Sequence, residues 1–162
     1  MAGAKQDQCR LRWALQRVRE ITDRYRAEWA AAGNSPDQLP LLGINRFVIA
    51  ADTDREAMEL GRRAWPSFHT SFMKLWKKHG TQPRFARLPE DFDSVVQNGA
   101  AIAGSPGTIR EQVKKMTDEA GANYFINQFS FGNLTQAEVL HSAGIFAREM
   151  LPTARERVVQ AI

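Results

Sequence analysis

Residues 101–131, AIAGSPGTIREQVKKMTDEAGANYFINQFSF, decide the fold because they predict a strand, a helix and a second strand with very little connecting chain. The apolar run Ala100–Ala103 predicts a short strand, and apolar residues at steps of three and four from Ile109 predict a helix. Gly121 ends this helix, and the aromatic run Asn123–Phe131 predicts the next strand. Strand, helix and strand in this order form the unit of parallel α/β sheets.

The same unit extends in both directions along the chain. Leu41–Ala51 is an almost continuous apolar run that predicts a buried strand, and Thr53 begins a helix that reaches about Lys78. Thr135 begins a final helix through a capping box with Glu138. The predicted segments are a leading helix at 11–33, strand-helix units at 41–78, 100–121 and 122–152, and a tail at 153–162.

Two features interrupt the regular pattern. Pro66 lies inside the second predicted helix, so we expect a kink or a break near Trp65. Lys77–Asn98 has no clear period, which predicts a long loop over 79–99. Long loops in compact domains often act as lids over functional sites, and an ordinary surface excursion is the open alternative.

A helix followed by three strand-helix units predicts parallel strands joined by right-handed crossovers. A closed (β/α)8 TIM barrel needs eight units and about 250 residues, whereas this chain has 162. We therefore predict a single α/β segment over 1–162 that forms part of such a barrel, with about three consecutive βα units. A small open doubly wound sheet with helices on both faces is the alternative.

Composition excludes several classes of function. The charged fraction of 25% and the net charge of +4 are ordinary, and the basic excess of the first helix is typical of a solvated face, so we expect no nucleic-acid partner. Cys9 is the only cysteine, which rules out an internal disulfide and favours the cytoplasm. No apolar stretch approaches the roughly 20 residues of a membrane helix, and we expect no membrane association.

Catalytic motifs are scarce. No HExxH, CxxC, GxSxG, Walker or GxGxxG pattern occurs, so we predict no metal site, and the three histidines do not form a recognisable set. The turn Gly104–Gly107 runs from a strand into a helix N-terminus, where backbone N–H groups can hold an anion. The alternative is that Ser105 and Pro106 only begin the helix. Gln128–Phe131 would lie on the catalytic face of a barrel, with core packing as the open alternative.

Three stretches of the chain carry a family resemblance. IAADTDREAMELGRRAW at 49–65, AGSPGTIREQV at 103–113 and GANYFINQFSFGNLTQAEVLHSAGIFAREMLP at 121–152 together resemble the C-terminal half of luciferase-like, flavin-dependent monooxygenases. The resemblance implies a (β/α)8 barrel whose last three strands are present here. It also implies reduced FMN, supplied by a separate reductase, or the deazaflavin F420 of some branches, bound at the carboxyl ends of the strands.

By the same resemblance, the segment before the Gly-Ser-Pro turn is a mobile lid with contacts from Arg84 and Arg87. The cofactor contacts that the resemblance implies are Gly104, Ser105, Gly107, Gln128 and Ser130. The chain departs from the family at Gly107 and Thr108, where acidic or polar helix formers are usual. The N-terminal strands, which carry most phosphate contacts and the catalytic residues of the family, are absent.

These observations predict a flavin-dependent monooxygenase that uses O2 and a small-molecule substrate, present as a C-terminal half that needs a complementary N-terminal half. The alternative is a non-catalytic flavin-binding or structural half-barrel that associates with itself. A truncated product without a function of its own is a third possibility. Aldehydes, alkanes, sulfonates and terpenoids all remain open as substrates.

Overall fold

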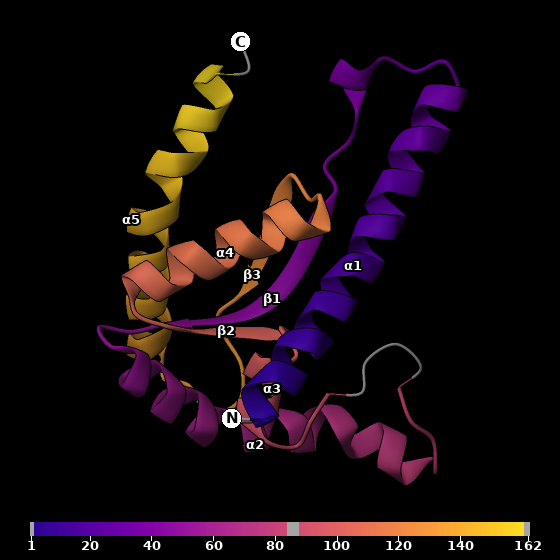
Figure 1. Cartoon of the computed structure of the whole chain (residues 1–162). Coiled ribbons are helices and arrows are strands. Elements are labelled where there is room, and N and C mark those ends of the chain that lie inside the picture. The colour runs from indigo at the N-terminus through magenta and orange to yellow at the C-terminus, as the bar shows by residue number, and fades with distance from the viewer. Residues whose placement is uncertain (1, 84–87, 161–162) are drawn as a thin grey trace.

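The computed structural model describes the backbone of residues 2–83 and 88–160 and the side chains of residues 15–83 and 88–150. Helices surround a small central sheet (Figure 1). The elements in chain order are α1 (Ala2–Ala31), the 3-10 turn η1 (Pro36–Gln38), β1 (Gly43–Ala50), α2 (Asp54–Lys78), α3 (Phe92–Gln97), β2 (Ala101–Gly104), α4 (Pro106–Ala120), β3 (Tyr124–Gln128) and α5 (Gln136–Gln160).

The sheet has three parallel strands in the order β2-β1-β3. β2 pairs with the C-terminal half of β1, from Phe47 opposite Ala101 onwards, whereas β3 pairs with the N-terminal half, up to Phe47 opposite Gln128. The first strand therefore lies in the middle. In a row of three successive barrel strands the second strand would lie in the middle. The order of the strands could therefore not be predicted from the sequence pattern.

Helices cover both faces of this sheet. Val48 and Ile102 point towards the face that α1, α4 and α5 cover, and Ile49 and Ala103 point towards the face that α2 and α3 cover. Crossovers between parallel strands have the same hand. When two of them run in opposite directions along a sheet, their helices therefore lie on opposite faces. The parallel strand-helix architecture is confirmed, with helices against both faces of these three strands.

Local signals place most helix ends where the sequence predicts them. Gly33 and Gly121 end α1 and α4 with positive φ angles of 79° and 62°. The Thr53 hydroxyl accepts a hydrogen bond from the N–H of Glu56 at the start of α2. At the start of α5, Glu138 donates its N–H to the Thr135 hydroxyl. In return the Glu138 carboxylate accepts from the Thr135 N–H, so the capping box is complete.

Two prolines lie inside helices that continue past them. α2 runs without a break through Pro66, and α5 continues past Pro152 to Gln160. In each case the carbonyl left without its helical partner belongs to an arginine four residues earlier, Arg62 or Arg148. Both arginines are solvent-exposed, so water can satisfy those carbonyls. The third strand also ends early, at Gln128 and not at Phe131.

The core consists of two clusters, one on each face of the sheet. The face under α1, α4 and α5 is mainly aliphatic, whereas the face under α2 and α3 is aromatic. Trp65 is fully buried there, with ring centroids 5.1 Å from Phe47, 5.1 Å from Phe68 and 6.0 Å from Phe131. Its indole N–H donates to the carbonyl of Pro89 at 2.8 Å.

Arg46 is the exception on the aliphatic face. It lies in β1 opposite Asn127 of β3, and burial lowers the pKa of its guanidinium. The Arg46 Nη1 donates to the carbonyl of Asn45 at 2.7 Å, but its buried Nε has no hydrogen-bond partner. The buried Oδ1 of Asn127 has none either. No carboxylate among the described residues neutralises this cation, so the site costs free energy.

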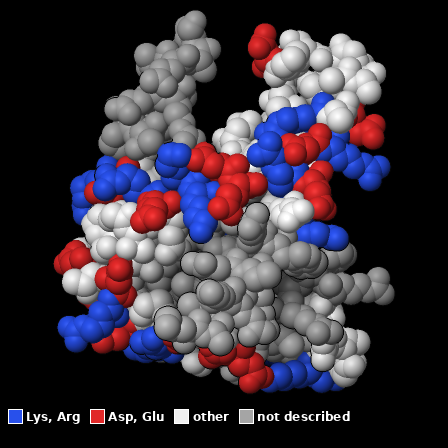
Figure 2. Space-filling view, in the orientation of Figure 1, with Lys and Arg blue, Asp and Glu red and all other residues white. Residues whose placement is uncertain are grey.

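Surface charge is mixed. Figure 2 shows Lys and Arg interleaved with Asp and Glu across the described part of one face of the molecule. Ion pairs such as Arg19 with Asp23 and Lys114 with Asp118 account for this alternation on α1 and α4. The described part of this face therefore carries no large field of one sign.

Candidate active-site edge

The carboxyl ends of the three parallel strands meet at one edge of the sheet, which is where ligands bind in α/β folds. β1 is followed by Asp52 and Asp54, β2 by Ser105, and β3 by Phe129 and Ser130. Carboxylates and hydroxyls therefore dominate this edge. We refer to Asp52, Asp54, Ser105, Thr108 and His141 as the strand-end cluster.

Asp54 joins two strand-helix units. Its Oδ1 accepts the backbone N–H of Ser105 at 2.7 Å. This bond, with further bonds from the hydroxyls of Thr108 and Ser105, holds the pKa of the Asp54 carboxyl below its ordinary value. Gly104 makes the approach possible, because a Cβ there would lie 2.5 Å from the Thr108 Cγ2 and 2.9 Å from the Asp54 Oδ1. An internal carboxylate thus sits at the N-terminus of α4.

This arrangement bears on the predicted anion site. Ser105 is the N-cap of α4 and Pro106 is the first helical residue, as expected, but the Ser105 hydroxyl lies 3.2 Å from the Thr108 hydroxyl and makes no capping bond. Its backbone N–H is taken by Asp54. Gly107 is different, since a Cβ there would meet nothing within 4 Å. Gly104 and Ser105 have internal roles, and Gly107 remains a predicted contact.

α5 is tied to the end of β1 by two hydrogen bonds. The Ala50 N–H donates to the buried hydroxyl of Ser142 at 2.8 Å, and the His141 Nε2 lies 3.2 Å from the Asp52 Oδ1. Ser142 takes the position beside β1 that a longer β3 would occupy. His141 was not expected to belong to any site. The signal that could have found this group is a pair of aspartates directly after a buried strand.

At the end of β3, the aromatic residues pack inside the protein. Phe131 is 6% exposed and belongs to the aromatic cluster, and Phe129 packs on Phe146 with ring centroids 5.5 Å apart. Core packing, the alternative left open for them, is therefore what the structure shows. Gln128 is half-buried and Ser130 is exposed, so these two stay available as predicted contacts.

The predicted lid is only partly a loop. α3 lies inside it. The Asp91 carboxylate caps the start of this helix by accepting the N–H of Ser94. Phe92 and Val95 are buried, and Leu88 offers its carbonyl to the Nε2 of His69 at 3.2 Å. Phe92 and Val95 therefore anchor this segment in the core. The expected lid contacts Arg84 and Arg87 lie outside the described residues.

A flavin phosphate does not fit the strand-end cluster. The phosphate is an anion, and the cluster presents Asp52 and Asp54, with the Ser105 N–H already bonded to Asp54. Arg63 pairs with Glu138 at 2.6 Å, and the His141 Nε2 lies against the Asp52 carboxylate. Within the described residues, no group of three or more His, Cys, Asp or Glu side chains could hold a metal ion.

A comparison with models of protein families identifies the family of this chain. The model of the luciferase-like monooxygenase family matches residues 10–124, more than two thirds of the chain. The chain belongs to this family. The match includes β1, α2, the Gly-Ser-Pro turn and α4, and it ends at the first residue of β3.

Relatives of this luciferase-like chain are much longer than it is. An uncharacterised protein, y4wF of Sinorhizobium fredii, is 27% identical over 134 residues, which is 83% of this chain and 39% of that protein. Among solved structures, the monooxygenase RslO1 of Streptomyces bottropensis is similar with a TM-score of 0.62 and 19% identity, over 86% of this chain and 38% of that one.

A second similar structure is the oxygenating constituent of the 3,6-diketocamphane monooxygenase of Pseudomonas putida, a type II Baeyer-Villiger enzyme in complex with FMN. The TM-score is 0.61 and the identity 21%, over 88% of this chain and 44% of that one. At this identity the likeness concerns the fold alone. The luciferase-like chain spans about two fifths of the length of these relatives. Within the described residues, no helix is long and apolar enough to cross a membrane.

Proposed function

We propose that this chain is the C-terminal part of a flavin-dependent, luciferase-like monooxygenase that acts on a small molecule with O2 in the cytoplasm. The observation that carries the proposal is the family match over residues 10–124. The similar structure that contains FMN supports a flavin as cofactor.

The contribution of this chain is one wall of a pocket at the carboxyl edge of the strands. Gly107, Gln128 and Ser130 are the proposed contacts to the cofactor ring, because each is accessible and has no internal role there. The phosphate contacts are assigned to a complementary N-terminal part, since Asp52 and Asp54 would repel a phosphate. The aromatic cluster behind the edge supplies a rigid support.

Comparing two flavins tests this division of roles. FMN and riboflavin differ by the phosphate, so a chain that holds only the ring should bind both with dissociation constants within about threefold, measured by quenching of flavin fluorescence. Gln128→Ala should weaken both about equally. Gln97→Ala, at an exposed position on α3, is the matched control and should change neither.

Each outcome has a definite meaning. Binding of FMN more than tenfold tighter than riboflavin would show that this part holds the phosphate after all. Failure of both flavins to bind at millimolar concentration would overturn the proposed ring contacts, and the function would then rest on the complementary part alone. In that case a non-catalytic structural half-barrel, the second candidate, becomes the better account.

A further inference from the structure

Arg46 is the only charged residue in the three strands that the structure describes. It lies in β1 directly opposite Asn127 of β3. Ile44 and Val48, two residues before and after Arg46, face the aliphatic cluster, so strand alternation places Arg46 on the same face. Strands of parallel sheets are usually apolar throughout, because helices cover both of their faces. A cation at this position therefore costs free energy unless an anion accompanies it.

The two paired side chains leave one donor and one acceptor unused. The Nε of Arg46 and the Oδ1 of Asn127 are buried, and neither has a hydrogen-bond partner among the described residues. The Arg46 Nη1 donates to the carbonyl of Asn45, which is a neutral group. Burial lowers the pKa of the guanidinium, because it removes water from the charged form. No carboxylate in the described part of the chain pairs with this cation.

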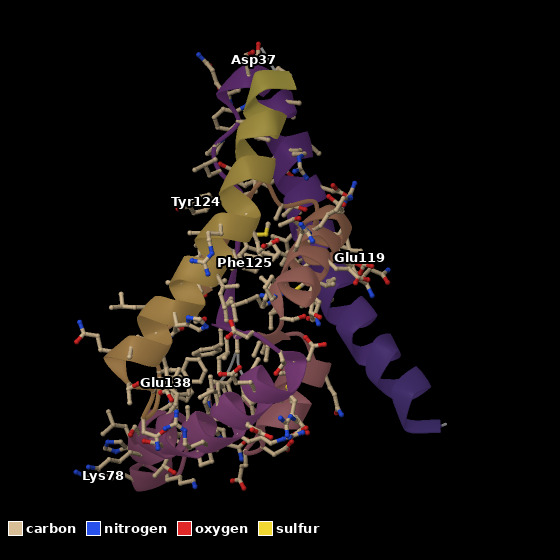
Figure 3. The ribbon with its side chains drawn as sticks, turned by 90° about the vertical axis from the view of Figure 1, so that its left-hand side faces the viewer. Asp37, Lys78, Glu119, Tyr124, Phe125 and Glu138 are labelled. Carbon is tan, nitrogen blue, oxygen red and sulfur yellow. The ribbon has the colours of Figure 1, made fainter. Side chains whose placement is uncertain are left out.

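Aromatic side chains surround the pair without closing it off. Phe125 and Phe129 lie two residues before and after Asn127, and the rings of both contact Phe146 of α5, with centroids 6.3 Å and 5.5 Å apart. In Figure 3, Phe125 points inwards beneath α5. These three rings are only partly buried, and Arg46 and Asn127 are half-buried. An apolar surrounding with a few polar groups is typical of small-molecule sites.

The geometry points to a binding site for the carboxylate group of an organic acid, with Arg46 as its cation and Asn127 as a second donor. A carboxylate both neutralises the guanidinium and accepts its unused Nε–H, whereas a water molecule would satisfy the hydrogen bond and leave the charge. The Asn127 amide can turn over, because its oxygen and nitrogen are nearly equal in size. The Nδ2 then donates from the position of the unpaired Oδ1.

The aromatic surrounding selects the kind of acid. A small inorganic anion would have to give up its water among phenyl rings, which costs free energy. An organic acid offers an apolar body to the rings of Phe125, Phe129 and Phe146 and keeps its charge beside Arg46. A cation kept at a cost in stability is also what a binding site requires, since function and stability trade against each other.

This site deepens the proposed function, on which the role of the acid as substrate rests. Asn127 directly precedes Gln128, the last residue of β3 and a proposed contact to the cofactor ring. A substrate held by its carboxylate at Arg46 would therefore lie at the end of the same strand. The binding of the acid does not require a flavin, so the two proposals can fail separately.

Thermal unfolding in sodium benzoate tests the site. With a dissociation constant of about 1 mM, benzoate at about 10 mM should raise the melting temperature of the native chain by about 3–6 °C. Benzamide has nearly the same shape and no charge. Benzamide, and sodium chloride at the same ionic strength, should each change the melting temperature by less than about 1 °C.

Three variants assign the effect to the paired side chains. Arg46→Gln removes the cation and keeps a polar side chain, so it should abolish the benzoate shift. Asn127→Ala removes the second donor and should reduce the shift. Arg55→Gln, at an exposed position on α2, is the matched control and should keep the shift of the native chain. Circular dichroism checks that all three variants are folded.

Nuclear magnetic resonance gives a second readout at the atom itself. The Nε–H signal of Arg46, assigned by its loss in Arg46→Gln, should move on titration with benzoate and stay in place with benzamide. The proposal would be overturned by equal effects of benzoate and benzamide, by no effect of benzoate, or by an unchanged benzoate shift in Arg46→Gln. Because these titrations contain no flavin, a failure of flavin to bind would count against the proposed function and not against this site.

Discussion

The two halves of the central sheet differ in how completely the chain covers them. Where β1 pairs with β2, helices lie on both faces, and Val48, Ile49 and Ile102 are at most 1% exposed. Where β1 pairs with β3, one face stays open, and Tyr124 and Ile126 are nearly half exposed. The first half is a finished core, whereas the second leaves apolar side chains exposed on one face.

Removing Trp65 should have the largest effect on the covered half. Trp65→Ala leaves a cavity among Phe47, Phe68 and Phe131 and removes the bond to Pro89, so we expect a loss of about 3–5 kcal/mol in the free energy of unfolding. Tyr124→Ala on the open half should cost less than about 1 kcal/mol. Urea titrations followed by circular dichroism measure both. Similar losses would mean that the two halves are equally well packed.

Substitutions at two glycines compare a crowded backbone position with an open one. Gly132 has a φ of +59°, and a Cβ there would lie 1.9 Å from the carbonyl oxygen of Ala64 in α2. Gly132→Ala should therefore cost about 2–3 kcal/mol, because strain and a clash add. Gly107→Ala at the exposed start of α4 meets nothing and should gain about 0.5 kcal/mol. Thermal unfolding of both variants measures the difference, and a destabilised Gly107→Ala would contradict the open space there.

Replacing Arg46 should stabilise the open half. Its buried Nε has no partner among the described residues, so Arg46→Met removes a partly buried, incompletely bonded cation while keeping the packing of the side-chain stem. We expect a gain of about 1 kcal/mol in the free energy of unfolding. Arg55→Met, at an exposed position on α2, is the control and should lie within about 0.5 kcal/mol of the native chain. A loss of stability in Arg46→Met would indicate that this cation has an anionic partner.

The smallest expected effect is the pH dependence of the Asp54 bond. The folded pKa of Asp54 is depressed, so its stabilising contribution is present above the ordinary carboxyl pKa and is lost as the pH falls through the folded value. Asp54→Asn should therefore lower the melting temperature at pH 7 and make little difference at pH 2. Asp37→Asn on η1 serves as the control. A difference for Asp54→Asn that persists at pH 2 would show that packing, and not charge, ties α2 to α4.

Part of this fold follows from short stretches of sequence. The helix ends at Gly33 and Gly121, the N-cap at Thr53 and the capping box at Thr135 depend on residues at most four positions apart, and they were predicted correctly. α3 escaped prediction because six residues are too few for a period to emerge. Its existence depends on Phe92 and Val95 reaching the aromatic cluster.

The candidate site was less predictable than the elements around it. The sequence predicted Ser105 at a helix start, but Asp54, which takes its N–H, lies 51 residues away. The same holds for Ser142, whose hydroxyl satisfies Ala50 across 92 residues. Gly107, Gln128 and Ser130 remain predictions, because they are accessible and no contact within the chain defines their role.

The sequence by itself determined the parallel strand-helix architecture and the helix ends, because apolar periodicity and capping are local properties, and the resemblance of three long stretches indicated the luciferase-like family. Only the tertiary structure decided that β1 lies in the middle, that Asp54 occupies the start of α4, and that one edge and one face of the sheet stay open. Those features depend on which surfaces meet across long stretches of chain, and burial of apolar area, not local propensity, selects among them.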